Sequence, residues 1–153
     1  MSKIIHPVAG TLAILLIAIF WFSTLIAELF GTTAQIIAVK TAIPWGFLLL
    51  VPALAAAGGS GAIRSRGRRG GLIDQKMRRM PVIAANGLLV LIPAALFLSW
   101  KAGADEIDSA FYAVQALELL AGAVNFTLLA LNMRDGLRMT GRLSKLPRHR
   151  LQL

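Results

Sequence analysis

The chain has 153 residues, the length of a single domain, and 57% of them are hydrophobic. Soluble proteins contain about 45–50% apolar residues even when glycine is counted. Only 15% of this chain is charged, so too few polar side chains are present to cover a water-facing surface. These values exclude a water-soluble monomer. The chain also has no cysteine, which excludes disulfides, zinc–thiolate sites, iron–sulfur clusters and cysteine nucleophiles.

Four apolar stretches are long enough to cross a bilayer as helices, because a hydrocarbon core about 30 Å thick needs about 20 helical residues. The strict alternation of apolar and polar residues that a membrane β-barrel needs is missing. The sequence therefore predicts an all-α fold, a transmembrane four-helix bundle that forms one membrane domain over residues 1–153. The predicted spans and basic segments are spans 7–29, 34–57, 81–100 and 109–133, a basic loop 58–80 and a basic C-terminal extension 134–153.

The basic residues predict the orientation of the bundle. Of the 16 lysines and arginines, all except Lys40 and Lys101 lie before the first span, between the second and third, or after the fourth. By the positive-inside rule, both termini and the central loop face the cytoplasm, so we expect a multi-pass protein of the bacterial inner membrane. The arginines of these segments are expected to contact anionic lipids. Nucleic acid is not an expected partner, because no aromatic residues alternate with the arginines.

Three ionisable residues fall inside the outer half of the predicted spans. Glu118 lies in the fourth span near the middle of the membrane, Lys40 lies in the second, and Glu28 ends the first. A charge at the centre of a membrane helix costs about 2.5–3.5 kcal/mol on insertion scales, so each of these groups needs a partner or a purpose. The sequence leaves two interpretations open. Either Glu118 is protonated or paired with Lys40 for structural reasons, or it carries protons or cations.

The fourth span has one polar face, which Gln115 shares with Glu118. The spacing of 3, 4, 3, 4 and 3 residues along it is typical of a helix that faces a partner helix. The residues on this face are Gln115, Glu118, Gly122, Asn125, Leu129 and Asn132. Gln115 belongs to the candidate proton or ion site. Because one bundle cannot satisfy the whole face, we expect a homo-oligomer, either a dimer or a trimer.

A second candidate site lies near the cytoplasmic side. His6 precedes Pro7 and is predicted to cap the first helix, where the helix dipole favours neutral imidazole. Neutral imidazole is the form that ligates haem iron, and Met77 and Met80 lie at the same end with Arg79 available for propionates. These residues predict a b haem with His6 as the metal ligand. The alternative is an interfacial histidine cap without a ligand.

Two asparagines complete the candidate cofactor site. Asn86 in the third span and Asn125 in the fourth have similar depth and are predicted to hydrogen-bond each other.

Small residues at a spacing of four predict close helix contacts in the second span, at Ala53, Ala57 and Gly61. Kinks are predicted at the prolines inside the spans, Pro44, Pro52 and Pro93.

Four segments of the chain resemble a family of small four-span bacterial inner-membrane proteins. They are HPVAG, FSTLIAELFG, RMPVIAANGLLVLIPAALFL and LELLAGAVNFTLLALNMRDGLR. The resemblance implies the fold and the membrane location, and it implies no activity, substrate or catalytic residue. The chain departs from four-helix haem proteins of the cytochrome b561 type, because its only histidines are His6 and His149.

Three functions follow as hypotheses. The leading one is electron transfer near the quinone pool by a bound redox cofactor, with b haem the expected cofactor and quinone a candidate partner. The second is a proton or cation channel or transporter that uses Glu118. The third is a noncatalytic assembly or interaction subunit that docks through its basic C-terminal extension.

Overall fold

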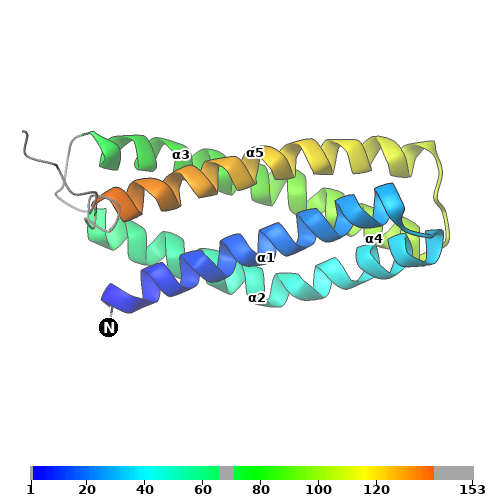
Figure 1. Cartoon of the computed structure of the whole chain (residues 1–153), viewed down its shortest axis with the longest axis horizontal. Helices are drawn as coiled ribbons and strands as arrows, with labels where there is room; N and C mark the ends of the chain where they lie inside the picture. The colour runs from blue at the N-terminus through cyan, green and yellow to red at the C-terminus, as the bar shows by residue number, and fades with distance from the viewer. Residues whose placement is uncertain (1, 66–70, 140–153) are drawn as a thin grey trace, which may run out of the picture.

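The computed structural model describes residues 2–65 and 71–139, and these residues are almost entirely helical. The elements are α1 (Ser2–Phe30), α2 (Thr33–Ser65), α3 (Leu72–Asn86), a π-helical turn η1 (Gly87–Leu91), α4 (Ile92–Gly103) and α5 (Ser109–Met139). Because α3, η1 and α4 follow one another without a break, the chain forms four long helical segments (Figure 1). Each segment contains a stretch long and apolar enough to cross a membrane. The predicted all-α fold, with four helices long and apolar enough to span a membrane, is confirmed.

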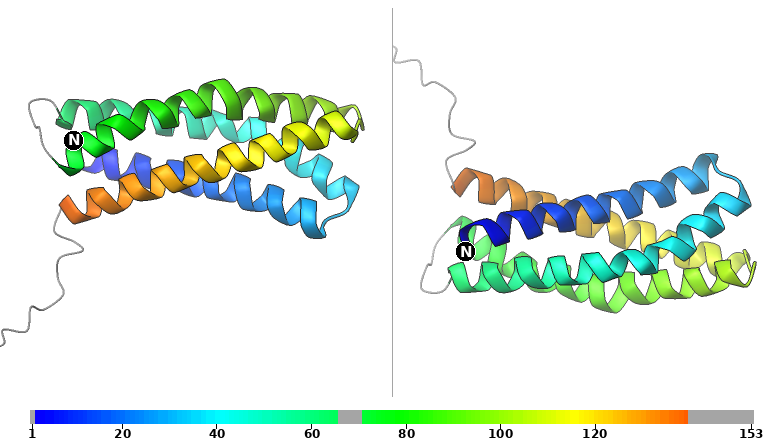
Figure 2. Two further views of the ribbon diagram at one scale, coloured as in Figure 1. Left: turned by 90° about the horizontal axis from the view of Figure 1, so that it is seen from above. Right: turned by 90° about the horizontal axis from the view of Figure 1, so that it is seen from below.

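The four segments lie side by side along the long axis of the molecule (Figure 1). The start of α1, the end of α2, the start of α3 and the end of α5 lie at one end, which we call the basic end (Figures 1 and 2). The α1–α2 and α4–α5 connections lie at the opposite end, which we call the hairpin end. This up-down arrangement places both ends of the described chain at the same end of the bundle.

Local sequence signals begin the two helices that start at the hairpin end. Thr32 and Gln35 form a capping box before α2, in which the Thr32 N–H donates to Gln35 Oε1 at 2.8 Å and the Gln35 N–H donates to Thr32 Oγ1 at 3.4 Å. Asp108 caps α5, because its Oδ1 accepts from the Phe111 N–H at 2.9 Å. The apolar residues that follow these capping residues continue the helices without further local signals, because in lipid only a helix satisfies all the backbone hydrogen-bonding groups of a single segment.

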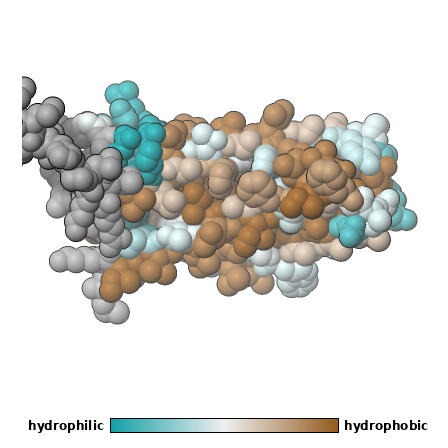
Figure 3. Space-filling model, viewed as in Figure 1, coloured by the Kyte–Doolittle hydropathy of each residue, from teal (hydrophilic) through white to brown (hydrophobic). Residues whose placement is uncertain are grey.

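The interior of the bundle holds two apolar clusters of small and medium side chains. The cluster nearer the hairpin end consists of Ala27, Ile36, Leu98, Ala102 and Phe111, and the other consists of Ala13, Ile17, Leu50 and Ala53. Ala53 therefore packs at a close helix contact, as its small-residue spacing predicts. Many of the largest apolar side chains instead point outward, among them Leu15, Ile19, Ile26, Leu89 and Leu120. The space-filling view shows an apolar surface between two polar ends, the surface of a membrane protein (Figure 3).

The helices extend beyond the predicted spans at the basic end. α2 continues to Ser65 and α3 begins at Leu72, so much of the expected loop 58–80 is helical. Glycines such as Gly58 and Gly59 do not end α2 here, because in lipid the backbone groups of a broken helix would have no other hydrogen-bond partner. α5 continues to Met139, so the first residues of the C-terminal extension are helical. Residues 140–153 of that extension lie outside the described part.

The prolines act differently in the two proline-containing spans. α2 stays continuous through Pro44 and Pro52, and its first part turns away from the line of the rest (Figure 2). In the third segment, the π turn ends at Leu91, two residues before Pro93. Proline has no N–H to donate to the carbonyl four residues back, and the turn instead bonds the Ile92 N–H to the oxygen of Gly87, five residues back.

Candidate functional site

A buried ion pair joins α2 to α5 in the half of the bundle nearer the hairpin end. The ammonium group of Lys40 contacts Oε2 of Glu118, and only 2% of the Lys40 side chain is exposed. Lys40 also donates to the Thr24 hydroxyl at 3.4 Å, and Nε2 of Gln115 lies 3.5 Å from the same Glu118 oxygen. The sequence leaves open whether Glu118 is protonated or paired with Lys40, and in the structure it is paired with Lys40.

Glu28 brings a second carboxyl group to this pair from α1. It interacts electrostatically with both Lys40 and Glu118. Its Oε1 is buried and has no hydrogen-bond partner among the described residues. We call Lys40, Glu118 and Glu28 the charged triad. When all three groups are ionised, the triad has two negative charges and one positive charge, so it is neutral only when it holds one more proton or cation.

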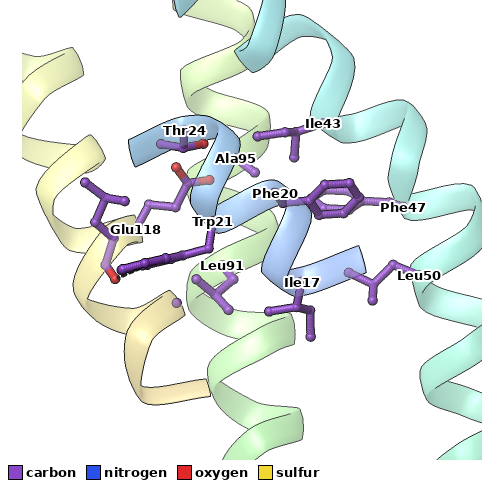
Figure 4. A pocket seen from close by; sticks show the side chains of 12 residues that line it. Ile17, Phe20, Trp21, Thr24, Ile43, Phe47, Leu50, Leu91, Ala95 and Glu118 are labelled. Carbon is purple, nitrogen blue, oxygen red and sulfur yellow. Dashed lines mark hydrogen bonds between the residues drawn. The ribbon is translucent and has the colours of Figure 1, made fainter. Parts of the chain in front are cut away.

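A small pocket lies beside the triad on the side toward the middle of the bundle. It encloses about 70 Å³ and opens between helices. Its walls are apolar and aromatic apart from Thr24 and Glu118, and Figure 4 shows them from close by. The lining residues are Ile17, Phe20, Trp21, Thr24, Ile43, Phe47, Leu50, Leu91, Ala95, Glu118, Leu119 and Gly122.

Trp21 is fixed in the wall of this pocket. Its indole N–H donates to the backbone oxygen of Leu119 at 2.9 Å. A side chain at Gly122 would conflict with the indole, because a Cβ there would lie 2.8 Å from Trp21 Cδ1. Glycine on the polar face of α5 therefore lets the edge of the indole ring approach that helix closely. The sequence gives no sign of this role beyond the spacing of Gly122.

The polar face of α5 is buried along its length, as its spacing predicts. Gln115, Asn125 and Asn132 are each at most 5% exposed. One side-chain oxygen of each is buried without a hydrogen-bond partner in the described part of the chain, namely Gln115 Oε1, Asn125 Oδ1 and Asn132 Oδ1. The face continues to Asp135, and 20 residues of helix rise about 30 Å, the thickness of a bilayer core. It therefore provides acceptor groups at several depths across the whole membrane.

At the basic end, Asp135 forms a second buried charge cluster that sequence analysis missed. Its side chain is 1% exposed and accepts from Arg79 at 2.7 Å and from Arg134 at 3.4 Å. The signal was present, because Asp135 continues the polar spacing three residues after Asn132. Arg79, predicted to be available for haem propionates, is bound to this aspartate.

The structure places His6 inside α1 rather than at its start. The prediction of a helix cap is wrong, because α1 begins at Ser2, one turn earlier than Pro7 suggested. His6 Nδ1 lies 2.9 Å from the backbone oxygen of Ala57 and 3.2 Å from the hydroxyl oxygen of Ser60. The imidazole therefore contacts the last turns of α2.

Met80 also lies against this part of α2, with its Cε 3.9 Å from where a side chain at Gly58 would begin. Its sulfur accepts from Asn132 Nδ2 at 3.6 Å. The side chain of Met77 lies outside the described part of the chain. Within that part, no three histidine, cysteine, aspartate or glutamate side chains gather where they could hold a metal ion.

The two asparagines do not bond each other as predicted. Asn86 Nδ2 donates to the backbone oxygen of Ala121 at 2.9 Å, one turn before Asn125. Asn125 instead faces η1, with its Nδ2 3.7 Å from where a side chain at Gly87 would begin. The two spans are still joined at this depth, because an amide can satisfy a backbone carbonyl as well as another side chain.

An ion-pair cluster with a buried lysine and two half-exposed carboxylates holds the hairpin end. Lys101 pairs with Glu106 at 3.1 Å and with Asp108 at 2.7 Å. The hydrogen bond from Lys101, together with that from the Phe111 N–H, holds the pKa of Asp108 below its ordinary value. Because Asp108 also caps α5, this cluster fixes how α4 leads into α5.

Of these features, the charged triad with its pocket is the strongest candidate site. Three helices bring titratable groups together in an apolar setting, and the total charge of the groups depends on a proton or a cation. No family model, curated protein or solved structure matches the chain. The chemistry of the site is therefore interpreted from its own geometry.

Proposed function

We propose that the protein is a proton or cation transporter of the bacterial inner membrane, and that the charged triad takes up and releases the transported charge. The observation that carries the proposal is the buried Lys40–Glu118 pair, with Glu28 on a third helix near enough to interact electrostatically with both groups. The charge ratio of the three groups leaves one negative charge to be balanced. A group that exchanges protons or cations inside a membrane needs these properties.

Stability alone is a poor reason for such a site. Removing two charges from water costs several kcal/mol per ion, and well-packed apolar residues of similar volume often replace a buried ion pair at no loss of stability. The buried polar face of α5 adds further acceptor oxygens between the triad and the basic end. A transported proton or cation would use these oxygens in turn.

The proposal includes an orientation and partners. The positive-inside rule puts the basic end in the cytoplasm and the hairpin end on the opposite side, so the triad lies in the outer half of the membrane. Arg78 and Arg138 are exposed at the basic end, where they would contact anionic lipid headgroups. We propose a homodimer or homotrimer, in which further copies cover the outward faces of the helices.

Flux measurements on protein reconstituted in liposomes test the proposal. We expect the wild-type protein to dissipate an imposed pH or cation gradient and Glu118→Gln to abolish this flux. Glu106→Gln is the matched control, because it makes the same chemical change at a half-exposed carboxylate at the hairpin end. Wild-type flux no greater than that of protein-free liposomes, or flux unchanged in Glu118→Gln, would overturn the proposal.

A second candidate function is electron transfer near the quinone pool by bound b haem. It is favoured by the contact of His6 Nδ1 with the Ala57 carbonyl, because histidines that ligate metals usually donate their other ring N–H to such an acceptor. The visible spectrum of the purified protein, before and after dithionite, tests it. A Soret band that shifts on reduction and is lost in His6→Ala would support it, and a colourless protein from haem-replete cells would exclude it.

A further inference from the structure

We propose that the transported ion is a small alkylated ammonium cation, and that the pocket beside the triad binds its alkyl groups. This inference rests on the proposed transport function and names its substrate class. Three observations carry it: the aromatic lining of the pocket, the uncompensated negative charge next to it, and its size.

The aromatic lining is arranged as a cage. Trp21 forms one wall, and Phe20 and Phe47 lie across the pocket in an edge-to-face pair with ring centroids 6.3 Å apart. Figure 4 shows the Trp21 ring edge-on, with the carboxyl group of Glu118 above its face. A cation between that carboxylate and the ring would be attracted from both sides. Aromatic faces of this kind are how proteins recognise quaternary ammonium groups.

The charge next to the pocket requires a positive ligand. Lys40 supplies one positive charge to the two carboxyl groups of Glu118 and Glu28. Glu28 Oε1 is buried without a hydrogen-bond partner in the described chain, so it is an acceptor that a proton or a cation can satisfy. Glu28 does not line the pocket, so a proton on its carboxyl group and an organic cation in the pocket would compete through the total charge of the triad.

The size and chemistry of the pocket select among cations. Its volume of about 70 Å³ is less than half of the roughly 150 Å³ that holds a benzene molecule in an engineered protein cavity. It therefore takes methyl or ethyl groups of a cation rather than a large ring, and the rest of the ion would lie in the opening between the helices. Hard inorganic cations such as Ca²⁺ take 6–8 oxygen ligands. Among the lining side chains, only Thr24 and Glu118 offer oxygen.

Exchange follows from this competition. When the cation enters, the O–H bond of the protonated carboxyl group in the triad breaks, and the proton leaves to water. The charge of the site is the same before and after, because one positive charge replaces another. No electrons move and no other reactant is needed. The protein would thus exchange one proton for one alkylammonium ion.

The experiment uses tetramethylammonium as the probe and Trp21 as the reporter. Trp45→Phe/Trp100→Phe leaves Trp21 as the only one of the three tryptophans, and the two removed side chains are exposed on the outer surface. We expect tetramethylammonium chloride, but not potassium chloride, to change the Trp21 fluorescence of this detergent-purified variant saturably. In weak buffer, about one proton should be released per ion bound. The added Glu118→Gln substitution should remove both signals.

A pair of glycine variants provides a second test that does not alter charge. Gly122→Ala adds a Cβ that would lie 2.8 Å from Trp21, whereas a Cβ at Gly10 meets nothing within 4 Å. We expect Gly122→Ala to weaken tetramethylammonium binding at least tenfold and Gly10→Ala to leave it unchanged. Equal affinity in the two variants would overturn the aromatic cage.

The outcomes separate this inference from the transport function. Glu118-dependent proton flux without tetramethylammonium binding overturns the substrate class and leaves the transporter. Saturable binding with proton release but no flux supports the binding site and overturns transport. Binding of potassium and tetramethylammonium with equal affinity overturns the selectivity for alkyl groups.

Discussion

Trp21 of α1 and Leu119 of α5 are joined by a hydrogen bond of 2.9 Å from the indole N–H to the backbone oxygen. Leu119 directly follows Glu118 in the chain, and both residues line the pocket with Trp21. The bond therefore holds the ring and the carboxyl group in a fixed relation. Helix packing and the candidate site depend here on the same contacts, so changes to the triad should be detected as changes in stability as well as in transport.

Lys40→Met should strongly destabilise the protein, because it leaves the Glu118 carboxylate buried without its ammonium partner. Breaking a buried pair on one side costs about 3–5 kcal/mol. Thermal unfolding in detergent measures the effect. Lys40→Met/Glu118→Leu should recover most of the loss, because it removes both charges. A double variant as unstable as the single one would contradict this account of the pair.

Asp135→Asn should loosen the basic end by removing the charged acceptor of Arg79 and Arg134. Hydrogen bonds to charged groups contribute about 1.5–3 kcal/mol, and Asp135 is 1% exposed. We expect increased proteolysis at this end and a lower unfolding temperature. Arg138→Gln is the control, because that side chain is exposed. Similar losses in the two variants would show that the ion pairs of Asp135 are not responsible.

The hairpin end should become less stable in acid. Lys101 holds the pKa of Asp108 below its ordinary value, so the folded state binds this proton less readily than the unfolded state does. The stabilisation is complete above the ordinary pKa of an aspartate and is lost as the pH falls through the lowered one. The unfolding temperatures of wild type and Asp108→Asn should therefore differ at neutral pH and converge in acid. A constant difference would exclude this origin.

The absence of cysteine makes the orientation directly measurable. A single cysteine in place of Glu106 at the hairpin end should react with an impermeant thiol reagent added to spheroplasts. A single cysteine in place of Gln75 at the basic end should react only after the membrane is opened. Both residues are exposed in the structure. The opposite pattern would overturn the proposed orientation.

The sequence predicts the fold well because its composition, its apolar runs and the spacing of its polar residues all indicate the same helical bundle. Apolar runs of membrane length have no stable alternative to a helix in lipid. The spacing of the polar residues on the last helix predicts which face is buried, and the same spacing continues to Asp135. The pairing of Lys40 with Glu118 was one of two open interpretations, because spacing within a helix does not say which side chain of another helix it meets.

The side-chain partners and the pocket could not be predicted from the sequence, because they depend on how the helices pack against one another. Asn86 satisfies the Ala121 carbonyl rather than Asn125, since a difference of one turn in depth decides the partner. Proline after His6 resembled a helix start, although α1 begins earlier. The pocket is made by residues of α1, α2, η1, α4 and α5, so only the assembled bundle contains it.

The π turn at Gly87–Leu91 rotates the side-chain positions of α4 around the helix axis relative to those of α3. A π turn holds one residue more than an α turn, and one residue corresponds to about 100° of rotation around a helix. Buried positions before the turn, such as Ile83, therefore lie at a different angle around the helix axis from the one that the α-helical spacing would predict from those after it, such as Leu98. Deletion of one residue within the turn would leave both halves helical and swing one of them relative to the other, turning the Lys101 side of α4 away from its neighbours.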